Sequence, residues 1–317
     1  IPTLCHMKAA NPTGACRICV VEVEGARALL AACATPATPK MVVRTESPKV
    51  GKARKLNLEL LLSSGHHNCL AQDLDPDSWT DFQLKTMEMK EHEDLCPAYG
   101  DCCLQDLAIR YQVKMNRFSP SQPRYPIEIV NPFIVRDLSR CVLCGRCVQA
   151  CNEIQVNHAI SYGYRGTASR IVAKGDRPLK DSDCVFCGEC VQACPVGALG
   201  AMRDFGARDV SKGETKRVRT TCGYCGVGCQ LYLHVREGRV IRVTGVEDIG
   251  PNYGGLCVKG RFGWAGKGLR FRFQGGYLRH SVIIPFRPEE AVQKGFIDDF
   301  QYLEKHYVID GFQRERH

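Results

Sequence analysis

Two stretches of the chain repeat one cysteine pattern, and this repeat constrains the fold more than any other feature. Both have the spacing C-x2-C-x2-C-x3-C, as CVLCGRCVQAC from Cys141 and as CVFCGECVQAC from Cys184. Disulfide scaffolds are usually short secreted chains, whereas this chain has 317 residues and gathers its 20 cysteines into tight clusters. The repeat therefore predicts metal ligation in a reducing compartment, and it disfavours zinc or disulfides.

The repeat is similar to the runs of two-cluster ferredoxins, in which the fourth cysteine of each run ligates the cluster of the other run. The resemblance implies two crossed [4Fe-4S] ligand sets: Cys141, Cys144, Cys147 and Cys194, and then Cys184, Cys187, Cys190 and Cys151. Gly145 and Gly188 allow the backbone to wrap closely around each cluster. Two clusters bridged in this way are close neighbours, which favours electron conduction.

A second cysteine group opens the chain with the spacing C-x10-C-x2-C-x13-C. One thiolate, a close pair and a distant fourth are the pattern of a plant-type [2Fe-2S] loop. The residues between them predict a strand at RICVVEVEG, a turn at EGAR and a returning strand at ALLAAC. A zinc site is the alternative, and it would favour two C-x2-C pairs. The pattern indicates a [2Fe-2S] site with these ligands: Cys5, Cys16, Cys19 and Cys33.

Residues 51–62 predict an amphipathic helix that ends at SSG. The sequence HHNC follows directly after its end. Further on, DLCPAYGDCCLQDL supplies Cys96 and Cys102, so that one histidine and three cysteines are available for a [4Fe-4S] cluster. The order of these sites resembles the amino-terminal region of the large iron-sulfur subunit of respiratory NADH dehydrogenase, and of cytosolic NAD-linked formate dehydrogenases and hydrogenases. The family pattern is H-x3-C-x2-C-x5-C followed by Leu-Gln, and this chain keeps C-x5-C and the Leu104-Gln105 pair.

The chain departs from the family pattern around the histidine. His66 and His67 lie closer to Cys69 than the pattern expects, and 26 residues separate Cys69 from Cys96 where two are usual. One interpretation is a surface insertion at 70–95, with His67 or His66 as the nitrogen ligand beside Cys69, Cys96 and Cys102. The other makes His92 the ligand, since its distance from Cys96 fits H-x3-C. Cys103 is left over as a packed side chain in either case.

A fourth cysteine group, TTCGYCGVGC, leads into two alternating segments, LYLHVRE and GRVIRVTG. Its spacing, C-x2-C-x3-C-x27-C, resembles the [4Fe-4S] domain at the start of molybdopterin-dependent enzymes, formate dehydrogenase in particular. The resemblance implies four ligands: Cys222, Cys225, Cys229 and Cys257. It also implies that Lys259 lies between cluster and pterin. The alternative for Lys259 is an exposed turn lysine with no pterin beside it.

The fold class expected is α+β, with small iron-sulfur domains in series and a C-terminal extension. The expected domains are a plant-type [2Fe-2S] ferredoxin β-grasp (1–50), a [4Fe-4S] domain with one histidine and three cysteine ligands and the insertion 70–95 (51–125), a bacterial two-[4Fe-4S] ferredoxin (126–210), a molybdopterin-oxidoreductase-type [4Fe-4S] domain (211–265) and a docking tail (266–317). The family implies a β-hairpin before Ile1, which we expect in a longer chain.

The cofactors expected are one [2Fe-2S] and four [4Fe-4S] clusters, with no flavin or pterin in this chain. A formal charge of +9 would ordinarily suggest a nucleic-acid partner, but the thiolate-bound clusters would add about nine negative charges. We therefore expect no nucleic-acid role. No stretch has the apolar length of a membrane span and no signal pattern opens the chain, which predicts a cytoplasmic location without a membrane span.

The resemblance implies an electron-transfer subunit of a hetero-oligomeric NAD(P)-linked oxidoreductase. Its partners would be a flavin subunit that exchanges electrons with NAD(H) and a separate catalytic subunit, such as a formate dehydrogenase, a hydrogenase or another reductase. The chain itself has no complete active site. Two alternatives stay open: the front part of a split or truncated molybdenum or tungsten formate dehydrogenase, and a structural adaptor whose terminal cluster domain is a relic.

Overall fold

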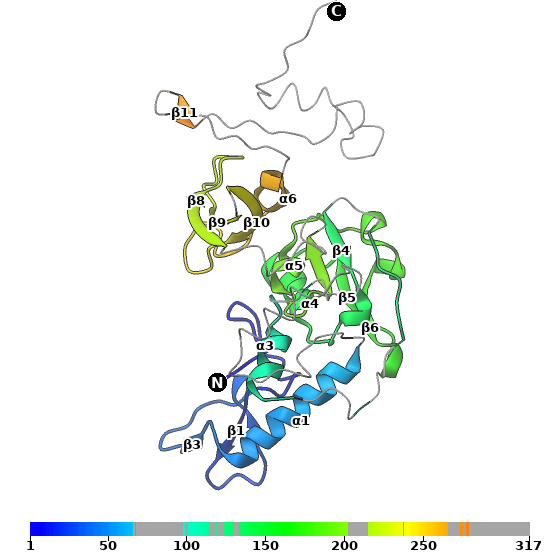
Figure 1. Cartoon of the computed structure of the whole chain (residues 1–317), viewed down its shortest axis with the longest axis vertical. Coiled ribbons are helices and arrows are strands. Elements are labelled where there is room, and N and C mark those ends of the chain that lie inside the picture. The colour runs from blue at the N-terminus through cyan, green and yellow to red at the C-terminus, as the bar shows by residue number, and fades with distance from the viewer. Residues whose placement is uncertain are drawn as a thin grey trace, which may run out of the picture. The chain divides into compact units, whose positions relative to one another are not determined.

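The chain divides into two compact units, Ile1–Gly213 and Glu214–His317. Figure 1 draws the computed structural model of the whole chain. The residues that the structure describes are 1–65, 67, 98, 101–113, 118, 123–129, 133–201, 215–236, 238–265, 273–274 and 277–278. Among them, no helix is both long and apolar enough to cross a bilayer.

The first unit begins with a small antiparallel sheet in the order β2-β1-β3. Its strands are β1 (Val20–Val23), β2 (Leu30–Ala31) and β3 (Val43–Arg44). The predicted strand pair is present: Val20 pairs with Ala31, and Gly25 makes the turn with a φ of +80°. Strand β1 begins directly after Cys19, and Cys33 lies just past β2, so the sheet brings the close cysteine pair and the distant fourth to one end.

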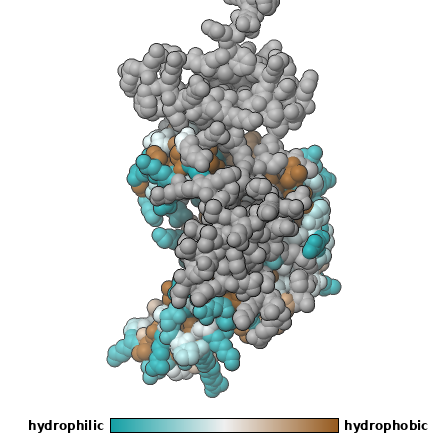
Figure 2. Space-filling model, viewed as in Figure 1, coloured by the Kyte–Doolittle hydropathy of each residue, from teal (hydrophilic) through white to brown (hydrophobic). Residues whose placement is uncertain are grey.

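Helix α1 (Pro48–Ser64) follows this sheet and contains the predicted helix 51–62. It begins earlier than predicted because the Ser47 hydroxyl accepts a hydrogen bond from the Val50 amide at 3.3 Å, and Pro48 has a φ suited to the first helical turn. Its inner face buries Val50, Leu58 and Leu62 at helical spacing. Figure 2 shows hydrophilic residues mixed with some hydrophobic ones at the surface in the region of β3.

Helix α3 (Cys103–Arg110) packs against α1 and completes the core of this part. Its inner face buries Leu104 and Ala108 among Leu58 and Leu62 of α1. The same core takes in Leu4, Ile18 and several cysteines, so the apolar packing and the cysteine groups of this unit are continuous. Figure 1 shows α3 beside α1 near the N-terminus.

The repeat region folds around two short helices, one for each copy of the motif. These are α4 (Arg146–Gln149), continued by a π-helical turn (Ala150–Ile154), and α5 (Glu189–Ala193). Two antiparallel strand pairs flank them: β4 (Ile134–Arg136) with β7 (Leu199–Ala201), and β5 (Ile160–Gly163) with β6 (Arg170–Ala173). The β4-β7 pair joins the start of the repeat region to its end, as Arg136 pairs with Leu199.

Short 3-10 turns connect these elements. They span Ala32–Ala34, Leu138–Arg140, Gly166–Ala168, Lys174–Asp176, Leu179–Asp181 and, in the second unit, Gly263–Ala265.

The second unit contains an antiparallel sheet in the order β10-β9-β8. Its strands are β8 (Lys216–Thr221), β9 (Gln230–Arg236) and β10 (Arg239–Gly245), and helix α6 (Val258–Phe262) packs against β10. The predicted pair β9-β10 is present and turns at Gly238, whose φ is +73°. Leu231, Leu256 and Trp264 lie in its buried core. Two further strands, β11 (Phe273–Gln274) and β12 (Tyr277–Leu278), pair with each other.

Two predicted features lie outside the described residues. They are the insertion 70–95 and, apart from β11 and β12, the tail 266–317. The coarse fold prediction, small domains in series with mixed helix and strand, is confirmed by the domains that the chain matches, described below.

Candidate metal centres

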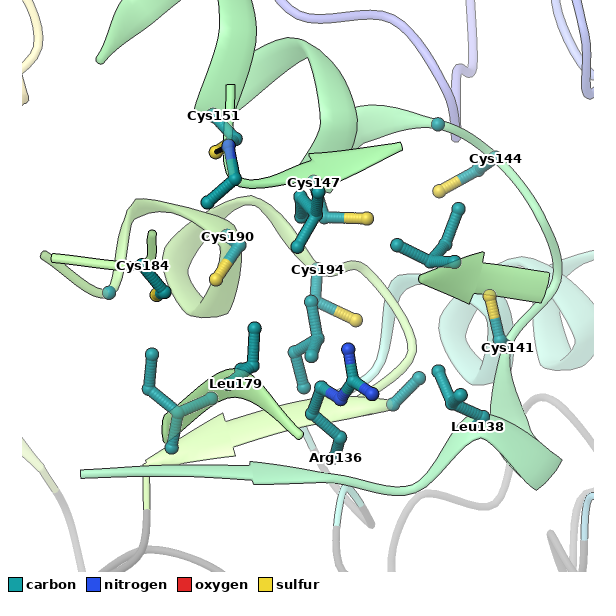
Figure 3. A pocket seen from close by; sticks show the side chains of 18 of the residues that line it. Arg136, Leu138, Cys141, Cys144, Cys147, Cys151, Leu179, Cys184, Cys190 and Cys194 are labelled. Carbon is teal, nitrogen blue, oxygen red and sulfur yellow. Dashed lines mark hydrogen bonds between the residues drawn. The ribbon is translucent and has the colours of Figure 1, made fainter. Parts of the chain in front are cut away.

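One cavity in the first unit is lined by all eight cysteines of the repeat. Its empty space, with the opening included, is about 790 Å³. Figure 3 shows Cys141, Cys144, Cys147, Cys151, Cys184, Cys190 and Cys194 around it, and Cys187 completes the lining. Apart from Arg136 and Asn157, the other lining residues are apolar residues or glycines. The structure therefore gathers eight sulfur atoms in a largely apolar interior.

The two copies of the motif form the same local loop. Leu143 and Phe186 occupy the same place in each copy, and both have a positive φ, of 53° and 52°. Gly145 and Gly188 follow with φ of +79° and +74° and precede α4 and α5. A positive φ at this position favours glycine, because glycine has no Cβ that would collide with the backbone. At Gly145 a Cβ would also meet the hydroxyl of Tyr162.

The fourth cysteine of the second run lies among the first three of the first run. Burial is the main cause that raises the pKa of Cys141 and of Cys144 to about 12, and the nearby Cys194 also raises both. Burial likewise raises the pKa of Cys147, with contributions from Cys141, Cys144 and Cys194. These four side chains are the first predicted ligand set, which stays a prediction.

The second predicted set is brought together in the same way. Burial raises the pKa of Cys184, and its neighbours Cys187 and Cys151 raise it further. Cys151 belongs to the first run, so its nearness to Cys184 matches the crossed arrangement. The amide of Ala159 donates to the Cys151 sulfur at 3.4 Å.

The four cysteines of the first group also meet. The Cys16 amide donates to the Cys5 sulfur at 3.5 Å, and the Cys16 thiol lowers the pKa of Cys5 by hydrogen bonding to it. Burial raises the pKa of Cys33 to about 11, followed by its hydrogen bond with Cys19. Cys5, Cys16 and Cys19 are buried and Cys33 is half-buried. The loop and the end of the small sheet thus present all four sulfurs to one place.

This first group packs directly against the repeat region. Leu4 and Cys5 share a core with Cys144 and Cys194. Asn11 links the loop to the π-helical turn after α4. The Glu153 carboxylate accepts hydrogen bonds from the backbone amide of Asn11 at 2.8 Å and from its side-chain nitrogen at 3.1 Å. The Gln149 side chain donates to the carbonyl oxygen of Asn11. The predicted [2Fe-2S] site therefore adjoins the first predicted [4Fe-4S] set.

Of the predicted set of one histidine and three cysteines, only His67 and Cys102 lie inside the described residues. His66, Cys69 and Cys96 lie outside them, as does the rival His92. His67 follows the end of α1 by three residues and is half-buried. Cys102 is 4% exposed and belongs to the core that contains Cys5 and Cys144. Cys103 is exposed, so the expectation of a packed side chain at this position is wrong.

The second unit gathers the fourth group at one end of its sheet. The amide of Cys222 donates to the carbonyl of Cys229 at 2.7 Å. Burial raises the pKa of Cys222, and the nearby thiols of Cys229, Cys257 and Cys225 raise it too. Lys259 lies two residues after Cys257, at the exposed start of α6. The structure thus unites these cysteines and leaves the lysine at their edge.

The chemistry of the donors fits iron-sulfur clusters. In the described part of the chain, no three His, Cys, Asp or Glu side chains converge as a single bound ion requires. The sulfur atoms instead surround shared spaces, and backbone amides point at some of them, as the Leu143 amide does at Cys141 over 3.4 Å. Thiolate ligation and N-H bonds to sulfur are how proteins hold such clusters and set their potentials.

Sequence reasoning missed both polar residues of the cavity wall, Arg136 and Asn157. Arg136 lies in the segment FIVRD, which ends four positions before Cys141. The available signal for Arg136 was a single charge within a short apolar strand. Every second side chain of a strand points to the same face, so Arg136 lies on the same face as Ile134.

Three family models match separate parts of the chain. They are a 2Fe-2S iron-sulfur cluster binding domain over residues 1–48, a 4Fe-4S dicluster domain over 140–198 and a molybdopterin oxidoreductase Fe4S4 domain over 215–266. Their matches contain the first, the repeated and the fourth cysteine groups. The chain is therefore an iron-sulfur protein built of small cluster domains in series.

Comparison with known proteins narrows this class. The G 2 subunit of NADH-quinone oxidoreductase of Rhizobium meliloti is 34% identical over 92% of this chain and 31% of its own length. The alpha subunit of NADPH-Fe(3+) oxidoreductase of Geobacter sulfurreducens is 35% identical over 84% and 28%. The crystal structure of an NAD+-reducing [NiFe]-hydrogenase has a chain that is 33% identical, with a TM-score of 0.51 over 64% of this chain and 75% of that one.

The chain is thus a homologue of the amino-terminal iron-sulfur region that these oxidoreductase subunits share. This confirms the resemblance found in the sequence. The chain spans about a third of the length of the curated relatives that it matches.

Proposed function

We propose that this chain is a multi-cluster electron-transfer subunit of an NAD(P)-linked oxidoreductase complex. The observation that carries the proposal is the single cavity lined by eight cysteines from two copies of one motif. Homologues in NADH-quinone and NADPH-Fe(3+) oxidoreductases, whose names state redox reactions, support it. When bound, iron-sulfur clusters supply the uptake and release of single electrons.

The proposed cofactors are one [2Fe-2S] and four [4Fe-4S] clusters. The [2Fe-2S] cluster would be bound by Cys5, Cys16, Cys19 and Cys33. The two crossed sets of the repeat would bind two [4Fe-4S] clusters, and the group in the second unit, from Cys222 to Cys257, would bind another. The fifth would take Cys69, Cys96, Cys102 and one histidine, which we assign to His67 or His66. The domain boundaries predicted from the sequence belong to the same proposal.

The residues around these sites would exclude water and orient the ligands. In the repeat, apolar side chains such as Leu179, Ile134 and Val196 surround the sulfurs. Each is at most 2% exposed. An environment without water keeps the rearrangement of dipoles around a cluster small, because few dipoles are free to reorient when the charge of the cluster changes. In the first unit, Cys5 and Cys144 lie in the same core. The [2Fe-2S] cluster and the first [4Fe-4S] cluster would therefore be neighbours between which an electron could pass.

The partners proposed are a flavin subunit that exchanges electrons with NAD(H) and a separate catalytic subunit, in a cytoplasmic hetero-oligomer. The names of the homologues support the multi-subunit part of this proposal, because each is named as a subunit of an oxidoreductase.

The test is metal and sulfide analysis of the natively purified complex under anaerobic conditions. We expect about 18 iron ions per copy of this chain, beyond those of its partners, and electron paramagnetic resonance (EPR) signals from both cluster types on reduction. Zinc in place of iron, or iron that accounts for only one cluster, would contradict the proposal.

A second candidate is that this chain is one part of a molybdenum or tungsten formate dehydrogenase. The match of residues 215–266 to a molybdopterin oxidoreductase Fe4S4 domain favours it. Molybdenum or tungsten in the same sample, together with a pterin-binding polypeptide, would support this candidate. Nickel without either metal would support a hydrogenase partner instead.

A further inference from the structure

Arg136 places a buried positive charge on the wall of the eight-cysteine cavity. Its side chain is only 7% exposed, and it stands at the end of β4, where it pairs with Leu199 of β7. Figure 3 shows the guanidinium directed into the space between the cysteines. The charge reaches the Cys184 sulfur, since Arg136 is one of the causes that lower the pKa of Cys184 against the effect of burial.

Glu128 holds this arginine from one side. Its Oε2 accepts from Nη2 of Arg136 at 2.7 Å, and the two backbones exchange hydrogen bonds of 2.8 and 3.0 Å. The other carboxylate oxygen, Oε1, accepts from the amide of Leu179 at 2.9 Å. Both oxygens of Glu128 are therefore engaged, and the guanidinium is fixed in one orientation.

Two donors of the guanidinium are left over. Nε and Nη1 are buried and make no hydrogen bond with the protein. A buried N-H of a charged group is costly to leave without an acceptor, because the group has lost its hydrogen bonds to water. Apart from Asn157, the residues that line the cavity with Arg136 are cysteines, apolar residues and glycines, so sulfur atoms with negative charge are the acceptors that suit these donors.

We propose that Arg136 sets the reduction potential of the clusters in this cavity by donating hydrogen bonds from Nε and Nη1 to their sulfur atoms, with Glu128 fixing its orientation. The proposal rests on the function proposed above. Reduction adds one electron to a cluster and makes the site more negative by one charge. Arg136 stays protonated throughout, so it favours the reduced cluster without moving a proton. Hydrogen bonds to sulfur and nearby charge are recognised determinants of cluster potential.

The test is a redox titration of the full chain with its clusters, followed by EPR. We expect Arg136→Met to make reduction of at least one of the two [4Fe-4S] clusters of the repeat about tenfold less favourable, a fall of 59 mV for a one-electron couple. Arg136→Lys keeps the charge and should recover part of the shift. Glu128→Gln removes a negative charge and should shift the same cluster in the opposite direction, to higher potential.

Two internal controls make the result specific. Arg177→Met removes an exposed arginine of the same domain that does not line the cavity, and we expect no shift from it. The [2Fe-2S] potential in the same samples should stay fixed in Arg136→Met.

The outcomes separate this inference from the function on which it rests. If the unsubstituted chain contains no [4Fe-4S] clusters in the repeat, the proposed function fails. If the clusters are present and neither Arg136→Met nor Glu128→Gln moves a midpoint potential, the inference alone is overturned. If Arg136→Met prevents cluster assembly, the sign of the Glu128→Gln shift decides, and a fall in potential would overturn the inference.

Discussion

Cys102 and Cys103 are consecutive, yet they have opposite environments. Cys102 is 4% exposed and packs in the core with Cys5 and Cys144, whereas Cys103 is exposed at the start of α3. A residue with a buried sulfur in a cluster of other cysteines suits ligation, and its exposed neighbour does not. The pair therefore offers a test in which the chemical change is the same and only the position differs.

We expect Cys102→Ala to lose one [4Fe-4S] cluster, about four iron ions per chain, because it removes a proposed ligand. Cys103→Ala should keep the full iron content. Iron analysis and the EPR spectrum of the reduced protein measure both. Loss of iron from the Cys103 variant alone would reverse the assignment.

The crossed arrangement of the repeat makes a second prediction for single residues. Cys144→Ala and Cys194→Ala should remove the same EPR signal although 50 positions separate them, since their sulfurs approach each other. Cys151→Ala and Cys187→Ala should remove the other signal. If Cys194→Ala instead removed the signal that Cys187→Ala removes, each run would hold its own cluster.

How far the sequence predicts these residues depends on their separation. Cysteines three or four positions apart must lie close together in any fold, so the groups could be recognised without coordinates. The pair of Arg136 and Glu128 could not, because their contact requires the chain to reverse over the seven intervening residues and form an isolated β-bridge. The histidine ligand is also beyond the sequence, since His66 and His67 lie close to Cys69 whereas His92 has the family spacing to Cys96.

Helix α1 is held in place by hydrogen bonds from a charged residue in its buried face. Arg54 is fully buried and donates to Glu46 at 2.8 Å, to the Tyr111 hydroxyl at 2.9 Å and to the Val20 carbonyl at 2.9 Å. It thereby joins α1 to β1 and to the end of α3. Sequence patterning predicted the helix from its leucines but gave no reason to place an arginine inward.

We expect Arg54→Met to destabilise the first unit by about 2 kcal/mol, because the Val20 carbonyl and the Tyr111 hydroxyl lose a buried partner. The midpoint of thermal unfolding, followed by circular dichroism, should fall by roughly 4–8 °C. Lys52→Met on the exposed face of the same helix is the control, with an expected effect within about 0.5 kcal/mol. Equal effects of both substitutions would show that Arg54 is not the fastening residue.

Strands were predicted unevenly, for a physical reason. The pair β9-β10 has clear alternation, with Leu231 and Leu233 buried and their neighbours partly exposed. Strand β8 has the sequence KRVRTT and is exposed along nearly its whole length, so it has no apolar alternation to detect. Its strand conformation depends on pairing with β9, which a window of its own sequence cannot reveal.

The four cysteine groups are distributed between the two compact units, and each group lies within one unit. Residues 1–213 contain three of the predicted cluster regions, and the unit that begins at Glu214 contains the fourth. A change in a ligand of the second unit should therefore be felt only there.

Cys257→Ala tests this division in the full chain. We expect it to lose about four iron ions and one [4Fe-4S] signal, and to leave the signals of the first unit unchanged in shape and potential. Cys144→Ala is the reciprocal variant, and it should leave the second-unit signal intact. Simultaneous loss of clusters from both units in either variant would show that they fold as one.

The two copies of the cysteine motif differ in what surrounds their ligands. The first copy supplies Arg146, Gln149 and Glu153, and the last two bind Asn11. The matching places of the second copy are Glu189, Gln192 and Val196. A chain in which the two motifs were exchanged would keep all eight sulfurs in register, yet it would present a valine to Asn11 where the carboxylate now accepts two hydrogen bonds. The symmetry of the repeat thus covers the eight cysteines and the loop conformation between them but not the contacts outside the loop, so the two copies are not interchangeable.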